Sequence, residues 1–283
     1  MSMDLSIDKK KIGFFVLFTY LFSFIFLIIA RVAFNQGSLV LYWVFVLLYS
    51  YTPMTVAFIM QKLVHKESIK PMLAFSFHFN KWFLIGWLFP LAFFWLSIGI
   101  GLIFPDTVYN SAVPTGRLFI YLLEAMVAGL SLNALLALGS EIGWRGFLMQ
   151  QLQKLHFFRK TLYIGLIWGI WLVPYVMDAA MNLFFVFKAL LIILYAILSS
   201  FFLNYIRLKS ESIIAVAIMS GTLSVLSVFD GVIYYFSNPF TSGLFGIAGI
   251  ISFAVFAIAL MIYDRYFAKE KVIFVGCGCG KNG

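Results

Sequence analysis

The sequence predicts an all-α polytopic membrane protein, a bundle of about eight transmembrane helices. Of its 283 residues, 63% are hydrophobic and 11% are charged, whereas soluble proteins average roughly 45–50% and about 25%. Apolar runs long enough to cross a bilayer recur along the chain, and basic residues collect in alternate connections between them. The two cysteines, Cys277 and Cys279, cannot supply a disulfide framework. These observations exclude a soluble enzyme, a disordered chain and a disulfide-stapled secreted module.

Eight apolar segments match the roughly 20 residues with which a helix crosses a hydrocarbon core of about 30 Å. In chain order they are residues 12–34, 39–60, 82–104, 118–138, 162–176, 182–204, 213–229 and 244–267. The fifth and seventh are short, so they either cross with little tilt or lie inside the bundle. No connection is long enough for an independent core. We therefore expect a cytoplasmic N-terminus (1–11), a membrane domain (12–267) and a flexible cytoplasmic tail (268–283).

The basic residues predict the orientation of the bundle. Seventeen of the 20 Lys and Arg residues fall in alternate connections or at the chain ends, and such residues accumulate on the cytoplasmic side. We therefore expect a multi-pass protein of the cell membrane with both termini in the cytoplasm. This orientation, with attraction to anionic lipid at the cytoplasmic face, accounts for the net charge of +9. Nucleic-acid binding is not expected.

Ionisable side chains within the spans are few, and such residues usually face the bundle interior or a functional site. Glu124 lies inside the fourth segment without a partner nearby in sequence, so it is either a protonated interior carboxyl or a binding residue. Glu141 and Arg145 follow at positions i and i+4, which favours an ion pair on one helix face. That pair either fastens the helix end to its connection or belongs to a functional site.

Histidine placement restricts the chemistry. His65, His78 and His156 all fall in predicted cytoplasmic connections, so the spans offer no imidazole for metal ligation or base catalysis. Neither a His nor a Lys is placed to activate a membrane serine. No glycine-rich phosphate loop occurs in the sequence. We expect no metal and no cofactor.

One stretch of sequence matches a known motif. Residues 133–148, NALLALGSEIGWRGFL, resemble the first signature of the CPBP family, the CAAX protease and bacteriocin-processing group also called Abi. The family pattern has two adjacent glutamates and, after three further residues, an arginine, commonly within Gly-Trp-Arg-Gly. The matching residues here are Glu141, Gly143, Trp144, Arg145 and Gly146. Ser140 stands where the first glutamate is expected.

Two further segments resemble the remaining signatures. Residues 166–174, LIWGIWLVP, are similar to the second, with Leu172 in place of its histidine. Residues 212–224 are similar to the third, with Ser220 in place of its histidine and Ser224 in place of its asparagine. The resemblance implies the CAAX prenyl endopeptidase fold and a prokaryotic cytoplasmic membrane. In the family, the first glutamate and the second-signature histidine are thought to activate a water, and the third-signature residues to support the oxyanion.

The four replaced positions lead to our functional expectation. They leave neither a carboxylate base at the water nor the family's oxyanion donors. We expect a non-catalytic pseudoprotease that binds a peptide or membrane-protein partner, as a bacteriocin-immunity-like or envelope-regulating scaffold. The candidate binding residues are Glu124, Asn133, Trp144, Trp168 and Trp171, although packing and interfacial anchoring explain the tryptophans equally.

Several alternatives stay open. The chain could be an active intramembrane endopeptidase that uses Glu141 or Glu124 in a shifted site, or a channel or carrier with Glu124 in its pathway. Cys277 and Cys279 are either two reduced thiols in an unstructured end or a site of palmitoylation or weak metal binding. Residues 150–160 are predicted to lie along the membrane interface.

Overall fold

The computed structural model describes residues 8–73, 75, 80–105, 107–176, 183–236, 240–241 and 243–274. Helices dominate this part of the chain. The elements are α1 (Lys9–Asn35), α2 (Leu39–Phe58), η1 (Ile59–Val64), α3 (Lys70–Leu73), α4 (Lys81–Gly101), β1 (Thr107–Tyr109), α5 (Thr115–Leu130), α6 (Leu132–Glu141), η2 (Ile142–Leu148), α7 (Met149–Gln151), α8 (Phe157–Val176), α9 (Leu183–Ser210), α10 (Ile213–Ile233), β2 (Tyr234–Phe236) and α11 (Ile247–Tyr266). The two η segments are short π-helical stretches that continue α2 and α6.

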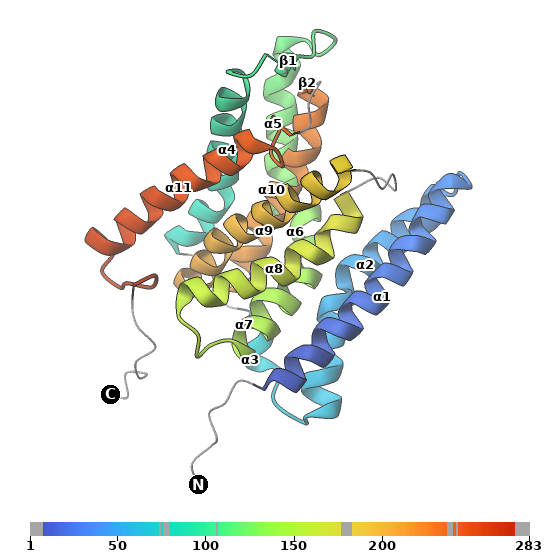
Figure 1. Cartoon of the computed structure of the whole chain (residues 1–283), viewed down its shortest axis with the longest axis vertical. Coiled ribbons are helices and arrows are strands. Elements are labelled where there is room, and N and C mark those ends of the chain that lie inside the picture. The colour runs from blue at the N-terminus through green and yellow to red at the C-terminus, as the bar shows by residue number, and fades with distance from the viewer. Residues whose placement is uncertain are drawn as a thin grey trace.

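Each of the eight predicted segments coincides with a helix, and successive long helices run in opposite directions (Figure 1). Among the described residues, six helices are long and apolar enough to span a membrane, and the bent pair that begins with α5 would make a seventh. The remaining segment, α8, has 20 residues but includes Arg159 and Lys160, which lower its hydropathy. The chain is therefore an all-α multi-pass membrane protein, as the sequence predicts.

The two segments predicted to be short are longer in the structure. α8 begins at Phe157 rather than at residue 162, and α10 continues to Ile233 rather than to residue 229. The first turn of α8 is held in the bundle because Phe157 is buried and its ring lies 5.2 Å from that of Phe201. Residues 150–160 are consequently shared between α7, a turn and the start of α8.

The fourth predicted segment is bent and extends further than residue 138. The two helices of the pair meet at 44°, and Ser131 lies at the break with φ −114° and ψ −96°. The Ser131 hydroxyl donates a hydrogen bond to the Val127 carbonyl at 2.7 Å, a bond to the preceding turn that often bends helices. Beyond the break, the helical path runs through α6, η2 and α7 to Gln151.

A small antiparallel sheet, which the sequence did not predict, joins two connections at one end of the bundle. Thr107 of β1 pairs with Phe236 of β2, and Tyr109 pairs with Tyr234. The Tyr109 and Tyr234 rings also meet edge to face at 5.8 Å. Strands of three residues are too short to produce a recognisable alternating pattern, so only tertiary packing reveals them.

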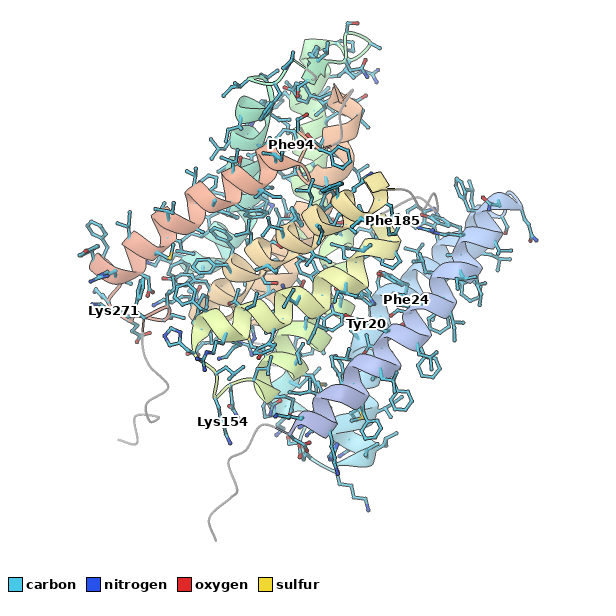
Figure 2. All side chains as sticks on the ribbon, viewed as in Figure 1. Tyr20, Phe24, Phe94, Lys154, Phe185 and Lys271 are labelled. Atoms are coloured by element: carbon cyan, nitrogen blue, oxygen red, sulfur yellow. The ribbon has the colours of Figure 1, made fainter. Side chains whose placement is uncertain are left out.

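α10 lies at the centre of the bundle, with α4, α5, α6 and α9 packed around it (Figure 1). In its most apolar 18-residue stretch, 61% of the residues are buried, against 22% in α1. α1 packs mainly on α2, and α11 packs on α4 and α9. Side chains project from the helices on all sides of the bundle (Figure 2), and many of the exposed ones are Leu, Ile, Val and Phe. Such a surface suits contact with lipid rather than water.

Buried charged residues fix both ends of the described chain. The Lys11 ammonium is 4% exposed and pairs with Glu67 Oε2 at 2.7 Å. After α11, the buried Asp264 carboxylate accepts hydrogen bonds from the backbone N–H groups of Val272 and Ile273. The beginning of the segment 268–283 is therefore tied to α11. Cys277 and Cys279 lie outside the described residues.

Candidate functional site: a membrane cavity beside a buried ion pair

The residues of the first signature form the most deeply buried stretch of the fourth segment. All residues from Gly139 to Met149 are buried, across the end of α6, all of η2 and the start of α7. Gly143 and Gly146 are required for this packing. A Cβ at Gly143 would lie 2.4 Å from Pro53 Cβ, and a Cβ at Gly146 would lie 2.4 Å from the Met72 carbonyl oxygen. The two glycines therefore let η2 approach α2 and α3 closely.

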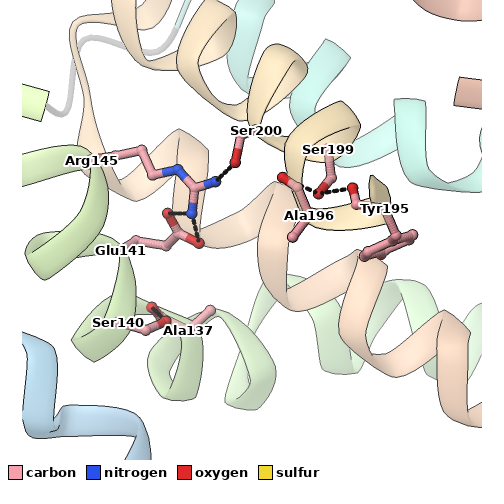
Figure 3. A network of polar contacts seen from close by, with 8 residues as sticks. All are labelled: Ala137, Ser140, Glu141, Arg145, Tyr195, Ala196, Ser199 and Ser200. Atoms are coloured by element: carbon pink, nitrogen blue, oxygen red, sulfur yellow. Dashed lines mark hydrogen bonds and ion pairs between the residues drawn. The ribbon is translucent and has the colours of Figure 1, made fainter. Parts of the chain in front are cut away.

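Glu141 and Arg145 form a buried ion pair (Figure 3). Arg145 Nη1 donates to both carboxylate oxygens of Glu141, at 3.2 Å to Oε1 and 3.0 Å to Oε2, and both side chains are 0% exposed. The i and i+4 spacing thus produces the predicted pair. Because it is enclosed on all sides, the pair is more than a solvated helix-end contact.

Other helices complete the surroundings of Arg145. Its Nη2 donates to Ser200 Oγ of α9 at 2.7 Å, and its guanidinium lies 4.5 Å from the ring centroid of Trp168 on α8. Ser220 of α10 lies near the Glu141 carboxylate. Three helices therefore meet at this pair: Ser200 of α9 accepts a hydrogen bond from Arg145, Trp168 of α8 lies against the guanidinium, and Ser220 of α10 lies near the carboxylate.

Beside the ion pair lies a cavity of about 490 Å³ between α2, α6, α8, α9 and α10, closed partly by Phe245 before α11. The four positions at which the sequence departs from the family signatures all line it. They are Ser140, Leu172, Ser220 and Ser224. The structure thus brings together residues from three separate signatures, as the resemblance implies.

Three of the five predicted binding residues also line the cavity: Asn133, Trp168 and Trp171. Trp144 does not line it, because its side chain is 0% exposed and packs edge to face on Phe15 and Trp171. Glu124 does not reach it either. The face of α5 that contains Ala125, Met126 and Gly129 turns inward, which leaves Glu124 exposed on the outside of the helix.

Glu141 and Arg145 stand behind the cavity wall rather than in it. Neither side chain contributes to the lining, although their neighbours Ser140, Trp168 and Ser220 do. The two terminal nitrogens of Arg145, Nη1 and Nη2, both donate hydrogen bonds, whereas its Nε is buried without a hydrogen-bond partner among the described residues. The Glu141 carboxylate is held in place by Nη1. This geometry favours the structural interpretation of the pair over a functional one.

The cavity offers hydroxyl, amide and aromatic groups. In the part of the chain that the structure describes, its lining includes no carboxylate, imidazole or cationic side chain. Ser140 Oγ donates to the Ala137 carbonyl of its own helix at 2.9 Å. A serine hydroxyl is a poor base near neutral pH, and Leu172 offers no polar atom. Among the described residues, no group of three His, Cys, Asp or Glu side chains could hold a metal ion.

Sequence reasoning missed Tyr49 and Tyr175, which form an aromatic wall of the cavity together with the predicted Trp171. The Tyr49 ring stacks on Trp171 at 4.2 Å and on Tyr175 at 5.3 Å, and its hydroxyl donates to the Trp171 carbonyl at 2.7 Å. Ser200, the partner of Arg145, was missed as well. In a chain that is 19% aromatic, nothing in the spacing separates Tyr49 and Tyr175 from residues that face lipid.

Comparison with known proteins agrees with this geometry. No curated protein matches the chain. Residues 122–226 match the family model described as type II CAAX prenyl endopeptidase Rce1-like. The matched residues include all of α6, η2 and α8, the ion pair and the four replaced positions. Residues 122–226 of this multi-pass membrane protein are therefore similar to the Rce1-like family of type II CAAX prenyl endopeptidases.

Proposed function

We propose that this protein is a non-catalytic member of the CPBP family, in which the cavity holds an apolar segment of a peptide or membrane-protein partner. The chemistry of the cavity lining carries the proposal: the positions that would activate water hold Ser140 and Leu172, and those that would support an oxyanion hold Ser220 and Ser224. The cavity is present although none of these four side chains can act as a general base.

The size and walls of the cavity support an apolar ligand. At about 490 Å³ it falls within the roughly 300–1,000 Å³ of typical small-ligand pockets. Trp171, Leu172 and Phe229 supply apolar surface, while the serines and Asn133 can satisfy a few backbone or hydroxyl groups. Trp43, 58% exposed, and Val228, 65% exposed, belong to the lining, so the cavity can be reached from outside the bundle. A segment already in the membrane is the natural occupant, as in an immunity-like or envelope-regulating scaffold.

The test is site-specific photo-crosslinking in native membranes. A photo-reactive residue at Ser224, in the cavity, should join a defined peptide of one membrane protein, identified by mass spectrometry. Filling the cavity with Ala137→Trp should abolish that product. The matched control is Leu135→Trp, which places the same bulk on the outer face of α6, where Leu135 is 59% exposed, and should leave crosslinking unchanged. Crosslinking that survives Ala137→Trp would place the partner elsewhere.

The second candidate is an intramembrane endopeptidase that uses Glu141. The position of Ser220 favours it, because this serine lines the cavity and lies near the Glu141 carboxylate. Membrane proteins that are cleaved by the wild type and recovered intact with Glu141→Gln would establish this activity. Glu124 lies away from the cavity, so an endopeptidase or carrier based on Glu124 has no such support. An ion flux in proteoliposomes that Glu124→Gln abolishes would support the carrier hypothesis.

A further inference from the structure

A second hollow, the lateral groove, lies between α4 and α11 with α9 and α10 as its floor. Its volume is about 220 Å³, and Trp82, Phe89, Tyr205, Phe256, Ala259 and Tyr263 are among its lining residues. It shares no lining residue with the cavity described above. The proposed function therefore does not account for it.

The lateral groove has the shape and polarity of a slot for one hydrocarbon chain. The Phe89 ring contacts the rings of Phe202 at 4.5 Å and Phe256 at 5.2 Å, and the Tyr205 hydroxyl is satisfied by Asp264 Oδ1 at 3.1 Å. From Trp82 to Phe89 the helix rises about 10 Å, most of the ~15 Å thickness of one leaflet. The volume is below the roughly 300 Å³ at which small-molecule pockets begin.

Two lysines stand at the end of the groove where α4 begins and α9 ends. Lys81 Nζ lies 5.2 Å from the centroid of Trp82, and Lys209 Nζ lies 5.8 Å from that of Tyr205. Both rings line the groove. Lys209 also donates to the Glu270 carbonyl. Within the described ranges, no carboxylate pairs with either ammonium group. Two cations without acidic partners thus flank an apolar slot.

We propose that the lateral groove binds one anionic phospholipid, with an acyl chain between α4 and α11 and the phosphate between Lys81 and Lys209. Basic residues at a membrane surface attract anionic headgroups, and Trp and Tyr, the residue types of Trp82 and Tyr263, are enriched at the headgroup level of membranes. The Trp82 and Tyr263 rings contact each other at 6.3 Å. Net charge alone would attract anionic lipid over the whole basic face of the protein. The lateral groove would hold one such lipid at a defined site.

Native mass spectrometry of the full chain in detergent, titrated with phosphatidylglycerol or phosphatidylcholine, tests the site. One phosphatidylglycerol should bind about tenfold or more tightly than phosphatidylcholine, because two lysines contribute to its binding. Lys81→Gln combined with Lys209→Gln should reduce its affinity to that of phosphatidylcholine. Ala259→Trp, which fills the slot, should weaken the binding of both lipids.

Two matched variants make the result specific. Lys62→Gln removes an exposed lysine of η1 away from the groove, and Val255→Trp adds a ring one turn along α11 at a residue that is 47% exposed and does not line the groove. Both should bind like the wild type, and the thermal unfolding midpoint of every variant in detergent without added lipid should be unchanged. Equal weakening by Lys62→Gln would mean diffuse surface attraction and would overturn the proposal. Unaltered binding with Ala259→Trp would do the same.

Discussion

Arg145 is surrounded by three kinds of partner, an anion, a hydroxyl and an aromatic ring, and it has no access to water. Removing the charge of one member of a buried pair leaves the other without compensation, which costs far more than the net stabilisation that the pair provides. At the scale of residues, the ion pair is therefore expected to control folding rather than chemistry.

Arg145→Leu should destabilise the protein by about 3–5 kcal/mol, because the Glu141 carboxylate would stay buried without its cation. Unfolding with denaturing detergent in lipid micelles measures this loss. The double variant Glu141→Leu with Arg145→Leu removes both charges and should recover much of the stability. If the double variant were no more stable than the single one, uncompensated charge could not be the cause.

The cavity residues show which site features a sequence can predict. The resemblance to three family signatures predicts that four replaced positions share one site. The structure places all four in one cavity: Ser140, Leu172, Ser220 and Ser224. Ser200 could not be predicted, since its contact with Arg145 depends on how α9 packs against η2. Glu124 was expected at the interior or in a binding site, but the orientation of α5 leaves it exposed.

At the scale of elements, η2 packs against α2 with no room for an added methyl group. Gly143→Ala would bring a Cβ to 2.4 Å from Pro53 Cβ and 2.8 Å from the Pro53 carbonyl carbon. Neither group is the end of a flexible side chain, so the helices must separate, and a loss of about 1–3 kcal/mol is expected.

Gly99→Ala is the matched control for this substitution. Gly99 is exposed on α4, and a Cβ added there would have no other atom within 4 Å, so alanine should stabilise the helix by about 0.5–1 kcal/mol. The thermal unfolding midpoints of the two variants should therefore move in opposite directions. A decrease of similar size in both would show that glycine is needed for reasons other than contact with Pro53.

Element positions follow from composition, but element shapes do not. Apolar length predicted all eight helical segments because the bilayer imposes it. The bend at Ser131 depends on one hydroxyl bond to Val127 and on packing against α10, and neither changes the hydropathy of the segment. The early start of α8 likewise depends on Phe157 meeting Phe201.

For the whole molecule, the eight apolar segments of the sequence predict an even number of membrane crossings, which would place the start of α1 and the end of α11 on one side. Lys154 and Lys271 both lie toward the lower left of Figure 2, on the side that we assign to the cytoplasm from the distribution of basic residues. The assignment of this side to the cytoplasm is a prediction from the positions of the basic residues, and it does not follow from how the helices pack.

The native cysteines allow a direct test of this orientation. Cys277 and Cys279 are the only two in the chain, so a membrane-impermeant maleimide should label the protein in inside-out vesicles and not in right-side-out vesicles. In a Cys277→Ser, Cys279→Ser background, Ser111→Cys places a thiol on the exposed connection between β1 and α5 and should give the reverse pattern. Labelling of Cys277 and Cys279 in right-side-out vesicles would show that the topology is the reverse of the one proposed.

The position of the ion pair behind the cavity wall has a consequence for how readily this scaffold can acquire new specificities. The groups that hold η2 in place, Glu141, Arg145 and Gly143, do not line the cavity, while the Ser140 hydroxyl bonds only to its own helix. Substitutions at Ser140, Leu172 and Ser224 can therefore change the shape and polarity of the cavity wall at little cost in stability. A combinatorial library confined to these three positions should consequently yield mostly folded proteins with altered ligand preferences.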